Sequence, residues 1–176
     1  MYAGHFAAGM AIKAVVPRAP TAVLAASIFL PDLLWLGLSV TDIEVVTPGA
    51  WFDGWSHSFA SIVLQSVVVG LVWSWSDARV AMALAGAVLS HLVLDLPMHP
   101  ALLEWYPYAS GGFGNLMHRS AGVAGPFGKS TGWWVEAAVV LCGAGVYVAA
   151  SRRIGIRRAA AAAGALLILS LQVAFG

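Results

Sequence analysis

Two side chains that can bind a metal ion stand four residues apart in an apolar stretch of this chain. His91 and Asp95 are separated by Leu-Val-Leu, and on an α-helix this spacing puts them on one face, one turn apart. A neutral imidazole and a carboxylate suit zinc, manganese or iron. The spacing alone is a weak signal, because a histidine often occurs four residues before an aspartate by chance.

Three more residues of the same ligand types lie in other apolar stretches, namely His5, Asp32 and His57. A titratable side chain inside a membrane helix is costly and usually has a function. Asp32, His57, His91 and Asp95 make up a set of two histidines and two aspartates, and His5 adds a fifth ligand. A second ion fits if a carboxylate bridges the two, and two-metal sites activate water and stabilise a displaced oxygen. We therefore expect the site to bind one or two ions of zinc or another divalent transition metal.

Two further residues are candidates for moving a proton. Neither Glu136 nor His99 is needed for the ligand set of the first ion, so either can serve as the catalytic proton acceptor. Glu136 has a second interpretation as an ion-pair partner of Lys129 or Arg119, and His99 has one as a solvated loop residue. The alternative for the whole set is a structural polar network, because buried polar side chains are normally hydrogen-bonded.

The composition indicates a membrane protein. Of the 176 residues, 60% are hydrophobic and 10% are charged, and the mean hydropathy is +0.84; soluble domains have about 45–50% apolar and about 25% charged residues. A soluble domain of this size could not bury so much apolar surface, whereas lipid covers it. The net charge of +1 gives no basis for nucleic-acid binding. The single cysteine, Cys142, excludes an intramolecular disulfide and a metal site built from several cysteines.

The apolar segments predict an all-α, polytopic helical membrane protein with about five to six membrane segments, in a single domain over residues 1–176. A membrane helix needs about 20 apolar residues. Five segments have about this length, and a sixth, at the start of the chain, is shorter. The five are 20–40, 57–75, 79–96, 132–150 and 159–175, and the shorter one is 2–16.

The positive charges orient these segments. If the chain crosses the membrane at every segment, seven of the nine Lys and Arg residues fall on one side, which the positive-inside rule makes cytoplasmic. The outer side then holds both termini, the loop 41–56 and the long connection 97–131. On this assignment five separate segments place polar side chains in the outer half of the membrane and none near the inner end, which is the strongest inference that the sequence allows. The seven cations are Lys13, Arg18, Arg79, Arg152, Arg153, Arg157 and Arg158.

The order of these residues resembles a known family, the YdjM-like membrane-bound metal-dependent hydrolases, also called LexA-binding inner-membrane hydrolases. The matching pieces are Gly4-His5, Leu30-Pro31-Asp32, Ser56-His57-Ser58, His91 to Asp95, and Asp95 to His99 followed by Tyr106-Pro107 and a Gly-rich turn. They span most of the chain. The resemblance implies a multi-pass protein of the bacterial inner membrane.

The order His, Asp, His and then HxxxD is also similar, more distantly, to zinc-dependent phospholipase C, an all-helical phosphodiesterase. That similarity implies that Asp32, His57, His91 and Asp95 share one ion. It also implies that His5 and Asp95 hold another. The chain has no clear HxxxE pair after His99, so the similarity does not extend to a third ion.

The function expected from the sequence is metal-assisted hydrolysis of an amphiphilic ester or phosphoester near the outer face. The site lies below a surface where four tryptophans gather, so a membrane lipid is the expected partner and a lipid-like molecule the expected substrate; neither the headgroup nor the oligomeric state follows from the sequence. The alternatives are a metal-binding membrane transporter and a non-catalytic membrane protein. Transporters place their site near the midplane, at broken helices and between repeats; Pro31 could break a helix, but no repeat is visible. The tryptophans are Trp51, Trp55, Trp105 and Trp133.

Overall fold

The computed structural model describes residues 2–47, 50–96, 103–113 and 131–152, and single positions between 157 and 169. Within these residues the chain is helical apart from two short antiparallel ribbons, so the predicted all-α class is confirmed. The helices are α1 (Tyr2–Val15), α2 (Thr21–Ile28), α3 (Leu30–Val40), α4 (Gly54–His57), α5 (Phe59–Ser74), α6 (Ala78–Asp95) and α7 (Thr131–Ala150). The ribbons pair β1 (Val45–Thr47) with β2 (Ala50–Phe52), and β3 (Leu103–Glu104) with β4 (Gly112–Phe113).

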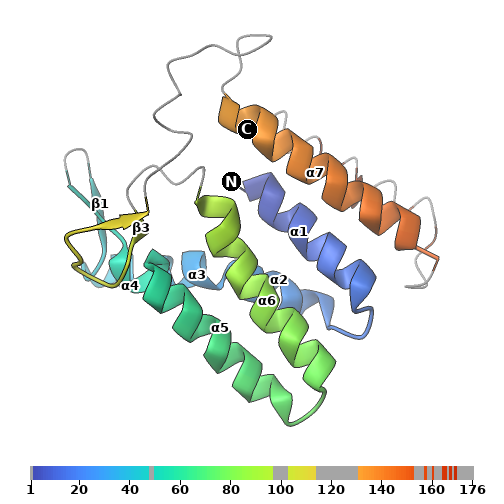
Figure 1. Ribbon diagram of the computed structural model, residues 1–176, viewed down its shortest axis with the longest axis horizontal. Helices are drawn as coiled ribbons and strands as arrows, with labels where there is room; N and C mark the ends of the chain where they lie inside the picture. The colour runs from blue at the N-terminus through green and yellow to red at the C-terminus, as the bar shows by residue number, and fades with distance from the viewer. Residues whose placement is uncertain are drawn as a thin grey trace.

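The long helices lie side by side in the order α7, α1, α6 and α5 (Figure 1). Helix α2 packs against both α1 and α6. Helices α1 and α7 run in the same direction and α6 runs in the opposite one (Figure 1). The start of α1, the end of α6 and the start of α7 therefore lie at one end of the molecule, where α4 and the ribbons also lie.

Helix α6 is the element around which the others pack. Asp77 caps its start by accepting hydrogen bonds from the backbone N–H groups of Arg79 (2.8 Å) and Val80 (3.2 Å), which satisfies donors that a helix start leaves unpaired. Its buried face carries Leu84 against α2 and Val88 against α5. The same helical spacing continues to the end of the helix, where it buries His91 and Asp95. The apolar packing of α6 thus positions two candidate ligands.

The segment 20–40, which the sequence predicts as one span, forms two helices bent by 60°. The break is at Phe29, which has φ −92° and ψ 12°. Pro31 explains it, because a proline has no N–H for the preceding turn and its ring clashes with that turn. At the start of a new helix a proline is well tolerated, and Pro31 lies there in α3. The bend places Asp32 in the first turn of α3.

Fewer helices could cross a membrane than the five or six that the sequence predicts. In the part of the chain that the structure describes, α6 and α7 are long and apolar enough, and the bent pair α2–α3 makes a third if it is one span. Helices α1 and α5 have 14 and 16 residues, which is about 21 and 24 Å at 1.5 Å per residue, against a hydrocarbon layer about 30 Å thick. The predicted segment 159–175 lies largely outside the described residues.

Large apolar side chains are exposed along the outer surfaces of several helices. Examples are Leu36 of α3, Leu64 and Val72 of α5, Val93 of α6 and Leu141 of α7. Soluble monomers rarely expose apolar surface on this scale. These side chains are therefore compatible with helices that lie in lipid.

Helices α1 and α7 approach each other closely at Gly143. A Cβ atom at this position would lie 2.5 Å from the carbonyl oxygen of Ala7, whereas one at Gly145 would have nothing within 4 Å. Gly143→Ala is therefore expected to push α1 away from α7 and to lower the free energy of unfolding by about 1–3 kcal/mol. The matched control Gly145→Ala is expected to be neutral or to stabilise the helix by up to about 1 kcal/mol. Thermal unfolding in detergent measures both, and equal stabilities would contradict the close approach.

Candidate metal centre

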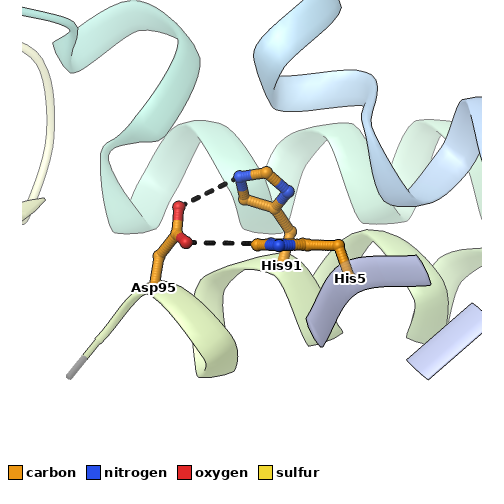
Figure 2. Close-up of side chains that lie close together, drawn as sticks. All are labelled: His5, His91 and Asp95. Carbon is orange, nitrogen blue, oxygen red and sulfur yellow. Dashed lines mark ion pairs between the residues drawn. The ribbon is translucent and has the colours of Figure 1, made fainter. Parts of the chain in front are cut away.

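Three ligand side chains from α1 and α6 form a first group at the end of the molecule described above. The two carboxylate oxygens of Asp95 face different imidazoles: Oδ1 lies 3.7 Å from Nε2 of His5, and Oδ2 lies 3.1 Å from Nε2 of His91 (Figure 2). The two ring centroids are 4.2 Å apart, and all three side chains are buried. Each residue offers a ligand atom within 4.8 Å of the others, so the group could hold a metal ion.

A second group joins α3, α4 and α6 and contains Asp32, His57 and His91. Oδ1 of Asp32 lies 3.5 Å from Nε2 of His57, and its Oδ2 lies 3.9 Å from Nδ1 of His91. Both histidines are buried, but the Asp32 side chain is 34% exposed. The Asp32 side is therefore the open side of the centre.

The two groups share His91, whose two ring nitrogens face different neighbours. Nδ1 lies 2.8 Å from the backbone oxygen of Ile28; a carbonyl oxygen only accepts hydrogen bonds, so Nδ1 carries the ring proton. Ile28 is the last residue of α2, and the last carbonyls of a helix have no partner within it. This hydrogen bond leaves the lone pair of His91 on Nε2, which faces Asp95.

The surroundings of His91 Nε2 fit a metal ion. This nitrogen is buried and makes no hydrogen bond within the described part of the chain, although Oδ2 of Asp95 is only 3.1 Å away. A nitrogen lone pair and a carboxylate oxygen repel each other at that distance. A cation attracts both atoms. Since imidazole and carboxylate are ligands of zinc, manganese and iron, the residues present fit a divalent transition metal.

All five ligands predicted from the sequence lie in these two groups, but the grouping differs from the one that the phospholipase similarity implies. That similarity puts Asp32, His57, His91 and Asp95 on one ion. In the structure, Asp95 is grouped with His5 and His91, and Asp32 and His57 are grouped with His91. The reason is that Nε2 of His91 faces Asp95, whereas Asp32 lies on the side of Nδ1, which carries the ring proton.

Glu136 lies beside the centre and belongs to neither group. Its Oε1 accepts a hydrogen bond from the backbone N–H of Gly4 at 3.2 Å, and the contact is buried. Gly4 directly precedes His5, so Glu136 connects α7 to the turn of α1 that carries a ligand. Its role as proton acceptor stays a prediction. His99 lies outside the described residues, as do Lys129 and Arg119.

Two polar residues beside the centre were not predicted as site residues. Glu44 is 1% exposed and accepts hydrogen bonds from the backbone N–H and the Oγ of Ser56, both at 2.7 Å. The same Oγ lies 2.7 Å from Nδ1 of His57. The available signals were that Glu44 is one of only eight acidic residues and that Ser56 directly precedes His57. Neither signal shows that the chain folds back to join them.

Comparisons with known protein families, with curated proteins and with solved structures found no match to this chain. The fold and the centre by themselves define a class: a helical protein whose described residues include two or three helices that could cross a membrane and buried His/Asp groups that could hold a metal ion.

Proposed function

We propose that this chain is a membrane-embedded metal-dependent hydrolase that acts on an amphiphilic ester or phosphoester near the outer membrane face. The observation that carries the proposal is the contact between His91 and Asp95, where a buried nitrogen without a hydrogen bond lies 3.1 Å from a carboxylate oxygen. Membership of the YdjM-like hydrolases and a place in the bacterial inner membrane are parts of this proposal. Zinc is the metal that the donor set favours most, in one or two ions.

The residues of the centre have different roles in the proposed reaction. When bound, the metal supplies a Lewis acid that activates water and polarises the ester or phosphoryl group. His5, His91 and Asp95 would hold one ion. Asp32 and His57 face the open side, where they orient the substrate or would hold a second ion. Glu136 or His99 accepts a proton.

The surroundings of the open side favour a lipid-like substrate. Helix α4, which ends at His57, lies next to an aromatic cluster of the ribbons. In this cluster the rings of Phe52 and Tyr108 stack at 4.5 Å, and Trp55 meets Tyr108 edge to face at 6.1 Å. Exposed aromatic rings are typical of the membrane–water interface, where lipid headgroups lie. A lipid reaches such a site by lateral diffusion. Release of headgroups or diacylglycerol from phospholipids by the purified protein tests this function.

The orientation in the membrane is also proposed, and the arrangement of the helices supports it. The end of α1, the start of α6 and the end of α7 lie opposite the metal centre (Figure 1). Lys13 is in the last turn of α1, Arg79 is in the first turn of α6, and Arg152 follows α7. The positive-inside rule makes this end cytoplasmic. The parallel α1 and α7 and the antiparallel α6 support a centre at the opposite, outer end.

Cysteine labelling tests this orientation. In a Cys142→Ala background, Ser110→Cys in the loop between β3 and β4 is expected to react with a membrane-impermeant maleimide in intact cells. Ser76→Cys in the turn between α5 and α6 is expected to react only after the cells are permeabilised. Both serines are exposed, so burial does not protect either. The reverse pattern would overturn the orientation and leave the metal centre untouched.

A metal transporter is the second candidate, and the bend between α2 and α3 favours it. Transporters often bind their ion at a broken helix, and Asp32 lies directly after the 60° bend. Against this, each ligand of the centre lies near one end of the molecule. Metal uptake into proteoliposomes by the wild type, with none in Asp32→Ala, would rank transport above hydrolysis.

A further inference from the structure

The hydroxyl group of Ser56 has three close neighbours and a single proton. Its Oγ lies 2.7 Å from Oε2 of Glu44, 3.1 Å from the backbone oxygen of Asp53 and 2.7 Å from Nδ1 of His57. A carboxylate can only accept hydrogen bonds, and hydrogen bonds to a charged group are the stronger ones. The Ser56 hydroxyl group therefore donates its hydrogen bond to Glu44.

This assignment decides the tautomer of His57. Because the Ser56 hydroxyl group donates to Glu44, its oxygen can only accept a hydrogen bond from His57. Nδ1 of that ring therefore carries a proton. A neutral imidazole with Nδ1–H has its lone pair on Nε2. Nε2 of His57 is the atom that faces Oδ1 of Asp32 at 3.5 Å, on the open side of the centre.

We propose that Glu44 and Ser56 are positioning residues that hold His57 as the Nδ1–H tautomer and direct its Nε2 lone pair to a metal ion beside Asp32. The proposal rests on the proposed metal-dependent function. His91 offers an independent parallel, because the carbonyl oxygen of Ile28 holds its Nδ1–H in the same way. Both central histidines of the centre are then ready to bind metal through Nε2, as metal-ligating histidines commonly are when their other nitrogen donates a hydrogen bond.

The β1–β2 ribbon brings Glu44 to Ser56. It thereby forms the hydrogen-bonded chain Glu44–Ser56–His57, which we call the relay. Glu44 directly precedes β1, and the register pairs Val45 with Phe52 at the far end of β2. The chain therefore returns after the ribbon to the place where it entered, and α4 starts beside Glu44. The two hydrogen bonds from Ser56 use both oxygens of the buried carboxylate. The ribbon thus has a function beyond connecting α3 to α4.

The test reads the tautomer directly, by ¹⁵N NMR of histidine-labelled protein without metal, with His57 assigned from His57→Asn. The wild type is expected to show His57 as the Nδ1–H form. Ser56→Ala removes the acceptor of that proton and is expected to change His57 to the Nε2–H form, which can donate to Asp32. Glu44→Gln releases the Ser56 proton from its charged acceptor, so a fraction of the Nε2–H form is expected. The same His57 tautomer in the wild type and in both variants would overturn the proposal.

Zinc affinity gives the second readout. Ser56→Ala and Glu44→Gln are expected to bind Zn²⁺ about 10–100-fold more weakly, as is usual when the partner of a metal-ligating histidine is lost. Ser56→Thr keeps the hydroxyl group and is expected to restore the affinity. The matched control is Ser61→Ala, since Ser61 bonds to Ser58 and to the backbone of Gly54.

The two readouts separate the positioning role from the proposed function. If the wild type binds no Zn²⁺ while the tautomer still responds to Ser56→Ala, the metal function fails and the relay stands. If Ser56→Ala does not fold, Ser56→Thr and Glu44→Gln still decide the question. Equal tautomers and equal zinc affinities in Glu44→Gln and the wild type would exclude Glu44 from the relay.

Discussion

Asp95→Asn is expected to remove most of the zinc that the wild-type protein retains after purification. Asp95 is the residue that presents one oxygen to His5 and the other to His91, at 3.7 and 3.1 Å. An asparagine has nearly the same shape but no negative charge, so His5 and His91 are left as two neutral ligands. Loss of an outer-shell partner already lowers metal affinity about 10–100-fold, and loss of a ligand should lower it by at least as much.

Elemental analysis of the purified, zinc-loaded and dialysed protein measures this effect. Asp42→Asn is the matched control, because Asp42 is exposed and has a positive φ of 56°, a conformation that asparagine also adopts. The control is expected to keep the wild-type metal content. Equal zinc in Asp95→Asn and the wild type would remove the metal hypothesis, provided that both proteins elute as the same species in detergent.

The part of the centre that could be predicted from the sequence is the part that helix geometry dictates. His91 and Asp95 are four residues apart on an apolar helix, so their shared face follows from the period of the helix. The positive charges then oriented the segments and indicated that His5, Asp32 and His57 lie at the same end. The structure brings these five residues into two adjoining groups.

The rest depended on contacts that a sequence pattern does not carry. The bend at Phe29 divides one predicted span into two helices, and it leaves the carbonyl of Ile28 at a helix end where His91 can reach it. The amino acid at position 28 gives no sign of this role, since the bond uses the backbone. The ribbon that brings Glu44 to Ser56 has strands of three residues, too short for a clear alternating pattern. These features decide which nitrogen of each histidine can bind metal.

Release of headgroups or diacylglycerol is the second large effect that we expect. The purified protein, incubated in detergent with mixed phospholipids and zinc, is expected to hydrolyse at least one of them, and mass spectrometry identifies the product. His91→Ala is expected to lower the turnover by about 100-fold or more, because even outer partners of a ligand change activity about 10–100-fold. His91 belongs to both ligand groups, so its loss removes a ligand at the point where the two groups meet.

Ser90→Ala is the control for this variant. Ser90 is the neighbour of His91 on α6, and its hydroxyl group donates a hydrogen bond to the backbone oxygen of Ala87 in the same helix, at 2.7 Å. The turnover of the Ser90→Ala variant is expected to equal that of the wild type. Treatment with a chelator should abolish the turnover and added zinc should restore it. Turnover that survives the chelator, or that survives His91→Ala, would come from somewhere other than this centre, because both treatments remove what the His5–His91–Asp95 group contributes.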